Sequence, residues 1–190
     1  MGVPVINTGA MTVDEFYRYA DARPEHRKLE LIRGKPALNA AAASLLHQRI
    51  VGNIYFAMRN RVDPASWEVL TDYGVRVSEN NRPEPDVSVV PRLRCGSPAA
   101  QRDSGDTVVA FEVLSPSTEK LDLTTKREAY TSLPSLTHYV VIAQDAVGVI
   151  VFARDNRFRR HRLTSLEDVV ELRSVGVSLS LAEIYQDTGV

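Results

Sequence analysis

The spacing of hydrophobic residues and the start signals around them predict four helices. Over residues 44–61, apolar side chains recur every four positions and predict one buried face of a long helix. A second helix is predicted over residues 119–132, because Pro134 cannot continue it. Capping boxes, in which Thr or Ser is followed three residues later by Glu, open two short helices at Thr12 and Ser180.

Stretches rich in β-branched and aromatic residues predict the strands, with Gly, Pro and Asn between them. Residues 28–33 alternate in polarity up to Gly34, and with residues 35–39 they predict a hairpin. Residues 91–106 are polar and predict a loop. No repeat or linker interrupts the pattern, so we expect one α/β domain over residues 1–190. The remaining predicted strands cover residues 67–70, 75–78, 87–90, 107–114, 138–143, 147–153 and 157–163.

Composition narrows the class of protein. The formal net charge of -1 argues against a protein that coats nucleic acid through its overall charge, but it is compatible with a local basic patch. Cys95 is the single cysteine, so no intramolecular disulfide can form, which suits a reducing compartment. We find no apolar run of roughly 20 residues and no signal-peptide pattern at the N-terminus. We therefore expect a cytoplasmic protein without a membrane partner.

A glutamate interrupts one of the most hydrophobic predicted strands. Glu112 lies within residues 107–114, which are otherwise apolar on both faces. Burying a lone ionised carboxylate costs several kcal/mol unless a cation or metal ion meets it. Asp86 follows Pro85 at the entry of the predicted strand 87–90, and if the two strands pair, the two carboxylates converge. Such an oxygen-only pair suits a hard ion, Mg²⁺ or Mn²⁺.

Lys126 is the second candidate partner of Glu112. It lies on the helix that follows the Glu112 strand, and it shares one helix face with Asp122 and Tyr130. The spacing fits a plain structural ion pair as well as a functional lysine. Glu30 is a further carboxylate, and simple alternation in its strand predicts that it faces outward.

Arginines concentrate in one short segment near the end of the sheet. Arg157, Arg159 and Arg160 belong to this segment and are candidate contacts for a nucleic-acid backbone. The alternative is a solvated hairpin whose charges balance acidic neighbours. The charge pattern alone is compatible with both interpretations.

Several of these residues resemble the motifs of a known family. Glu112 lies in the string Phe-Glu-Val-Leu-Ser-Pro-Ser-Thr over residues 111–118, which is preceded by Pro-Asp-Val at 85–87. Together with the downstream Asp, Lys and Tyr at 122, 126 and 130, this pattern resembles the Uma-type restriction endonucleases of the PD-(D/E)XK nuclease superfamily. Leu-Glu-Leu-Ile-Arg-Gly at 29–34 and His47 also match that family. The resemblance covers roughly residues 12–162.

The resemblance implies a restriction-endonuclease-like core, in which helices flank a central mixed β-sheet. It implies that Asp86 and Glu112 bind Mg²⁺ or Mn²⁺, with the Val113 carbonyl as a further ligand. The superfamily places its lysine at a position that Leu114 occupies here, and Lys126 then replaces it from the next helix. Supporting roles fall to residues near this centre: Glu30 in the metal shell or on a water, Asp122 beside Lys126, and His47.

These residues together predict a metal-dependent endonuclease that hydrolyses phosphodiester bonds of nucleic acid, and we expect DNA. Cleavage of both strands would favour a homodimer. Two other classes are compatible with the sequence. One is a non-catalytic nucleic-acid-binding or regulatory module on the same scaffold. The other is a structural domain in which Glu112 and Lys126 form only a buried ion pair.

Overall fold

The computed structural model describes residues 9–23, 29–38, 44–92, 101–116 and 118–190. The N-terminal segment, Cys95 and Ser117 lie outside these residues. The helices are α1 (Val13–Asp21), α2 (Leu45–Arg61), α3 (Glu119–Leu121), α4 (Arg127–Ser132) and α5 (Leu181–Ile184), with the π-helical segment η2 (Asp122–Lys126) and the 3-10 turns η3 (Arg154–Asn156) and η4 (Arg173–Val175).

A six-stranded mixed sheet forms the centre of the molecule, in the order β10-β9-β8-β7-β5-β3. Strands β7 and β8 run parallel, and the other neighbouring pairs in this sheet are antiparallel. Its strands are β3 (Trp67–Thr71), β5 (Val87–Pro91), β7 (Val109–Val113), β8 (His138–Ile142), β9 (Val149–Ala153) and β10 (Arg160–Leu163). Three smaller pairs are β1 (Leu29–Ile32) with β2 (Lys35–Leu38), β4 (Gly74–Val75) with β6 (Asp103–Ser104), and β11 (Val169–Leu172) with β12 (Val177–Ser180).

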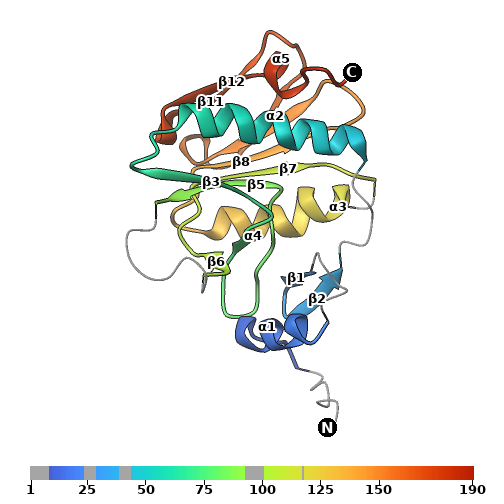
Figure 1. Ribbon diagram of the computed structural model, residues 1–190, viewed down its shortest axis with the longest axis vertical. Coiled ribbons are helices and arrows are strands. Elements are labelled where there is room, and N and C mark those ends of the chain that lie inside the picture. Colours follow the sequence, from blue (N-terminus) through green and yellow to red (C-terminus); the bar gives the residue numbers. More distant parts are fainter. Residues whose placement is uncertain (1–8, 24–28, 39–43, 93–100, 117) are drawn as a thin grey trace.

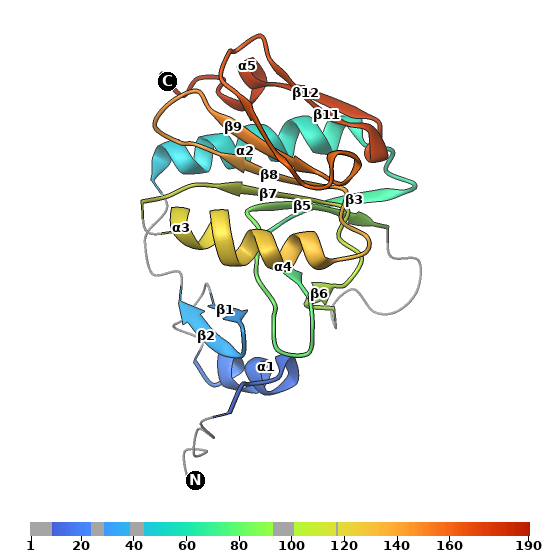
Figure 2. The ribbon, with the colours of Figure 1, turned by 180° about the vertical axis from the view of Figure 1, so that it is seen from behind.

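Helices cover both faces of this sheet, which confirms the predicted fold class. Figure 1 shows α2 on one face and the continuous run α3–η2–α4 on the other. The β11–β12 pair and α5 lie on the α2 side, as the reverse view also shows (Figure 2). The β1–β2 hairpin and α1 lie farther out on the α4 side (Figure 1). The apolar side chains of β7 divide between the two faces: Phe111 packs in the core under α2, and Ala110 packs in the core under α4.

Three sequence predictions need correction, and one pair of strands has no counterpart among the predictions. The strand expected at 75–78 is only the short β4, because the chain turns back in an isolated bridge between Ser78 and Asn81. The loop expected at 91–106 includes the short strand β6. The last predicted strand starts at Arg160 instead of residue 157, since Arg157 and Phe158 adopt left-handed backbone conformations, with φ of 60° and 55°. The pair β11–β12 was missed.

The pairing of β5 with β7 decides where the predicted carboxylates lie. Val87 is opposite Phe111, and Ser88 is opposite Ala110. Continuing this antiparallel register by one residue places Asp86 opposite Glu112, at the end of the paired segment. The two carboxylates that the sequence singled out therefore come from neighbouring strands at the same end of the sheet.

Candidate active site

Glu112 is buried, and two donors meet one of its oxygens. Its relative exposure is 4%, and that of Lys126 is 2%. Lys126 Nζ and the Tyr130 hydroxyl each donate to Glu112 Oε1 at 3.0 Å. The ion pair expected between Glu112 and Lys126 is therefore present. Tyr130 was part of the family motif, but its contact with the carboxylate was not predicted.

Lys126 also contacts two other carboxylates. Its Nζ lies 2.8 Å from Glu30 Oε1 and 3.3 Å from Asp122 Oδ1. The expectation that Glu30 faces outward is wrong, since its relative exposure is 5%. Alternation along β1 does hold, because Leu29 and Leu31 pack against α1. However, the opposite side of this strand faces Lys126 and not solvent.

The π-helical turn brings three polar side chains of one helix into a single line. Side chains four residues apart overshoot a full turn of an α-helix, which has about 3.6 residues per turn. A π-turn is wider, so the same spacing falls slightly short of a full turn. The step from Asp122 to Lys126 lies in η2 and falls short of a full turn, whereas the step from Lys126 to Tyr130 lies in α4 and overshoots one. The two offsets cancel, so the three side chains stay on one line. The sequence predicted a shared face, but it gave no sign of the π-turn.

Asp86 approaches the same centre from the neighbouring strand β5. Its Oδ2 accepts a hydrogen bond of 2.7 Å from the Val113 backbone N–H. Its Oδ1 lies 3.3 Å from Nε2 of His47, which belongs to the first turn of α2. The side chains of His47 and Asp86 are 11% and 13% exposed. Helices from both layers of the fold thus contribute to one site.

The protonation of this centre follows from burial and from the neighbouring charges. Burial raises the pKa of Glu112 well above its usual value; Lys126 opposes this shift, and Asp122, Asp86 and Glu30 reinforce it. Burial alone would lower the pKa of Lys126, but Glu112, Glu30 and Asp122 outweigh it and raise that pKa well above the usual range. Lys126 is therefore a fixed cation, which does not suit the role of a proton acceptor.

The donor set suits a hard divalent ion at one position. Asp86 and Glu112 offer carboxylate oxygens from opposed strand positions, and the carboxylates around Lys126 exceed its single positive charge. Within the described ranges, no three side chains of His, Cys, Asp or Glu form a metal-binding group by themselves. An ion between Asp86 and Glu112 would therefore need additional oxygen ligands, such as the Val113 carbonyl, water or a substrate phosphate.

The predicted basic segment is distant from this centre. Arg157, Arg159 and Arg160 are exposed on the turn and the first residue of β10, the outer strand of the sheet. β10 lies three strands away from β7, which corresponds to about 14 Å at the usual strand spacing. The structure does not bring these three arginines into contact with the carboxylates.

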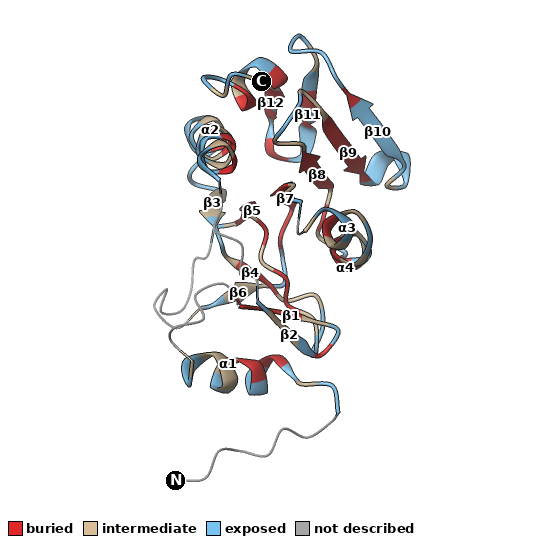
Figure 3. Ribbon diagram, turned by 90° about the vertical axis from the view of Figure 1, so that its right-hand side faces the viewer, coloured by how far each residue is buried: buried red, intermediate tan, exposed pale blue. Residues whose placement is uncertain are grey.

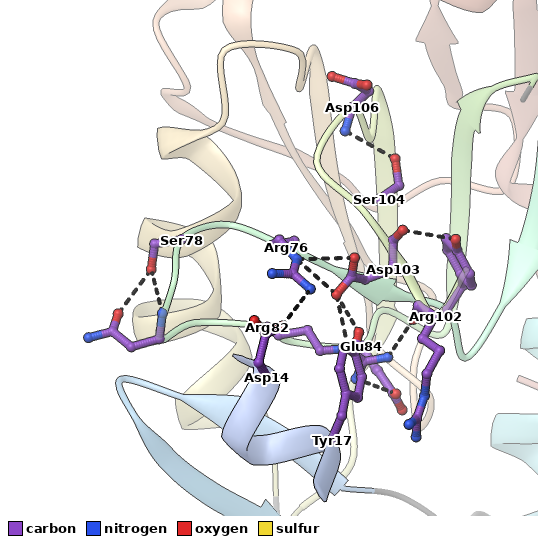
Figure 4. A network of polar contacts seen from close by, with 12 residues as sticks. Asp14, Tyr17, Arg76, Ser78, Arg82, Glu84, Arg102, Asp103, Ser104 and Asp106 are labelled. Atoms are coloured by element: carbon purple, nitrogen blue, oxygen red, sulfur yellow. Dashed lines mark hydrogen bonds and ion pairs between the residues drawn. The ribbon is translucent and has the colours of Figure 1, made fainter. Parts of the chain in front are cut away.

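A second buried cation was not predicted from the sequence. Arg82 donates to Glu84 at 2.6 Å, to the Tyr17 hydroxyl at 3.0 Å and to the Arg102 carbonyl at 2.8 Å (Figure 4). Asp103 lies 3.9 Å from the same guanidinium. The Glu84 backbone N–H donates to Glu30 Oε1 at 2.8 Å and so links this network to the Lys126 centre. The two prolines that flank Glu84 are the one sequence signal of this rigid connection.

Comparisons with known proteins agree with this architecture. The family model Uma2, described as "Putative restriction endonuclease", matches residues 13–182. A crystal structure of a putative nuclease belonging to DUF820 from Anabaena variabilis matches with a TM-score of 0.74 and 17% sequence identity. That match covers 92% of this chain and 97% of the other, and at this identity it shows the shared fold. A comparison with curated proteins found no match. Among the described residues, no helix is long and apolar enough to cross a bilayer.

Proposed function

Because the chain belongs to the Uma2 family of restriction-endonuclease-like proteins, we propose that it is a divalent-metal-dependent endonuclease acting on phosphodiester bonds. The observation that supports this proposal best is the buried Lys126 among Glu30, Glu112 and Asp122, next to Asp86 at the end of two paired strands. Carboxylates in excess at a strand end, with one fixed cation beside them, suit the binding of a metal ion and a phosphate together.

In the proposed mechanism, Asp86, Glu112 and the Val113 carbonyl hold one Mg²⁺ or Mn²⁺. When bound, such an ion polarises a phosphoryl oxygen and lowers the pKa of a coordinated water. His47, at 3.3 Å from Asp86, fixes the orientation of that carboxylate. The Val113 N–H, which donates to the other oxygen of Asp86, restricts it further. The Asp86 carboxylate is thus held in one orientation for binding the metal ion.

Lys126 supplies positive charge to the reacting phosphate in this proposal. Its raised pKa keeps it protonated, so it stabilises the charge that develops on the phosphate and orients the attacking water, and it does not remove the proton. Glu30 and Asp122 hold the ammonium group in place from two sides. Tyr130 keeps Glu112 in its orientation through the hydrogen bond to Oε1.

The substrate in this proposal is nucleic acid, and DNA is the expected form. Cleavage of both strands would favour a two-fold homodimer, which supplies one centre for each strand. We place its activity in the cytoplasm, which suits a chain with a single cysteine. The non-catalytic nucleic-acid-binding module and the structural domain are the two alternatives that the experiment below separates from an endonuclease.

The test compares two partly buried carboxylates, Asp86 and Asp103, whose side chains are each 13% exposed. Asp86→Asn should abolish Mn²⁺ binding in calorimetry and cleavage of plasmid and linear DNA. Asp103→Asn makes the same chemical change in the Arg82 network and should leave both signals intact in folded protein. Lys126→Met should keep Mn²⁺ binding and lose cleavage. If wild-type protein binds Mn²⁺ and DNA but cuts neither DNA nor RNA, the protein is a non-catalytic module. If it binds none of them, the centre is a structural ion-pair cluster.

A further inference from the structure

The outer strand β10 presents its arginines on two different parts of the molecule. Register places Arg160 opposite Phe152 and Arg162 opposite Ile150. Phe152 and Ile150 belong to the core under α4, so Arg160 and Arg162 face the same side of the sheet as Glu112 and Lys126. Figure 3 shows β10 as an exposed outer strand beyond β9.

A third arginine reaches this surface from α4. The guanidinium of Arg127 lies over the ring of Phe152, with 5.5 Å between Cζ and the ring centroid. Since Phe152 is the direct cross-strand neighbour of Arg160, the Arg127 and Arg160 side chains flank the same ring. We call Arg127, Arg160 and Arg162 the α4-side arginines.

The α4-side arginines differ from many other arginines of the chain in their partners. Arg33, Arg61, Arg76, Arg82 and Arg102 each form an ion pair with a carboxylate. Among the described residues, no ion pair involves an α4-side arginine, and the facing strand β9 has no charged residue. Three positive charges, two of them exposed and that of Arg127 half-buried, therefore lie on the same side of the sheet without an ion-pairing carboxylate in the described part of the chain.

The register also relates this surface to the candidate active site. Arg162 lies opposite Ile150, Ile150 opposite Val141, and Val141 opposite Glu112, so Arg162 is in the same row as Glu112. Three strand spacings separate the two, which is about 14 Å. Phosphates of one nucleic-acid strand follow each other at about 3.4 Å along the helix axis, so this distance corresponds to roughly four phosphates.

Arg157 and Arg159 occupy a different place on the same hairpin. They precede β10, at the end of the sheet where β7 begins: Arg157 lies in a left-handed turn with Phe158, and Arg159 follows this turn directly before the strand. They lie beyond the row of Arg160, farther from Glu112 than Arg162 is. They are exposed like Arg160 and Arg162. The hairpin thus offers two arginine pairs of equal charge at unequal distances from the centre.

We propose that the α4-side arginines bind the phosphate backbone of the nucleic acid that the active site cuts, and that Arg157 and Arg159 lie outside this contact. This inference rests on the proposed function for the identity of its ligand. It replaces the contact set predicted from the sequence, of which only Arg160 is retained. Phosphate contacts of this kind set the position of the substrate and carry no base sequence.

The experiment compares the double variants Arg160→Ala/Arg162→Ala and Arg157→Ala/Arg159→Ala, which remove the same charge from the same hairpin. Binding to a labelled duplex is measured by fluorescence anisotropy in EDTA between about 50 and 200 mM KCl, where no cleavage can occur. The first variant should lose about two units of the slope of log K against log salt, at roughly 0.9 for each phosphate contact. Affinity near 50 mM KCl should fall at least about tenfold. The second variant should match wild type.

Single-stranded DNA and double-stranded RNA of equal length serve as further ligands and show which backbone the surface prefers. Thermal melts of each variant establish that it is folded. Equal slopes for the two double variants, or an unchanged slope for Arg160→Ala/Arg162→Ala, would overturn the proposal. The proposal would also be overturned if Arg160→Ala/Arg162→Ala weakened the binding of polyglutamate as much as the binding of DNA, because the surface would then attract any polyanion. Binding by this surface in a protein that never cleaves would contradict the nuclease proposal and leave this contact intact.

Discussion

Lys126 and Arg82 are both buried cations surrounded by carboxylates, but their surroundings differ in charge and in hydrogen bonding. Arg82 distributes its donors over Glu84, the Tyr17 hydroxyl and a backbone carbonyl. A second arginine, Arg76, joins it at Asp103, so two cations face the two partly buried carboxylates of Glu84 and Asp103 (Figure 4). Arg76 also pairs with the exposed Asp14. A guanidinium suits such a fixed, multidentate arrangement. This network holds α1, β6 and the segment before Asp86 together.

The Lys126 centre is not balanced in this way. One ammonium group meets Glu30, Glu112 and Asp122, and Asp86 adds further negative charge beside Glu112. Burial and the excess of carboxylates raise the pKa of Glu112 well above its usual value. Burial of an ion pair therefore does not by itself indicate function. The informative feature is the unbalanced negative charge next to a partly accessible carboxylate.

The largest loss of stability in this comparison is expected from Arg82→Met. Removing one partner of a buried charge network leaves the other charges unpaired, which typically costs about 3–5 kcal/mol. Chemical denaturation of the variant measures this loss. Arg76→Met is the matched control, because the Arg76 side chain is 40% exposed and its loss should cost far less. A loss below about 1 kcal/mol for Arg82→Met would show that the balanced network does not hold the fold together.

Lys126→Met should give a loss of stability that depends on pH and that near pH 5 is smaller than the loss for Arg82→Met. A carboxyl group whose pKa is raised by folding keeps its proton while the unfolded chain releases it, so stability falls as pH rises above the unfolded value of 4.5. Without Lys126 the pKa of Glu112 rises further. The free energy of unfolding of the variant then falls by about 1.4 kcal/mol per pH unit for each carboxyl group that stays protonated only in the folded state. The variant should therefore be less impaired near pH 5 than near pH 8 in urea melts.

The control for this experiment is Lys120→Met, because Lys120 is exposed on α3 of the same helical run. Its stability should follow that of wild type at both pH values. An equal loss for Lys126→Met near pH 5 and near pH 8 would mean that the carboxylates around it do not take up protons. The distinction between the two buried cations would then disappear.

The smallest effect is expected at an exposed pair of the same chemical type. Arg61 donates to Glu183 on α5, and this hydrogen bond lowers the pKa of Glu183 to about 2. Both side chains are more than a third exposed, so solvent screening limits Arg61→Met to under about 1 kcal/mol.

Because the pKa of Glu183 is lowered, this contribution is present above about pH 4.5 and is lost as the pH falls towards 2. Melting temperatures of wild type and Arg61→Met between about pH 6 and pH 3 test this dependence, with Arg59→Met as the control on the same turn of α2. A loss as large as that of Arg82→Met would show that burial is not the variable that separates these clusters.

Most of the elements, and the residues that meet at the Lys126 centre, could be predicted from the sequence. Period and capping signals predicted α2 and the 119–132 helix, and the cost of a carboxylate in an apolar strand required a partner for Glu112. These signals are local, so they can be read without knowing the fold. Elements whose local sequence signal is weak were not predicted. Each strand of the β11–β12 pair is only four residues long, so the alternation of buried and exposed residues in it was missed.

Which charges face each other depends on the packing of segments that are far apart in the sequence. Glu30 alternates as an exposed residue would, but its strand lies against the helix that bears Lys126, so the carboxylate is buried. Asp86 meets Glu112 because the β5–β7 register places them opposite, and the π-turn aligns Asp122, Lys126 and Tyr130. Register, layer order and helix distortion depend on contacts between residues far apart in the chain. Periodicity reports the environment of one segment, whereas the balance of charge in a site depends on the several segments that meet there.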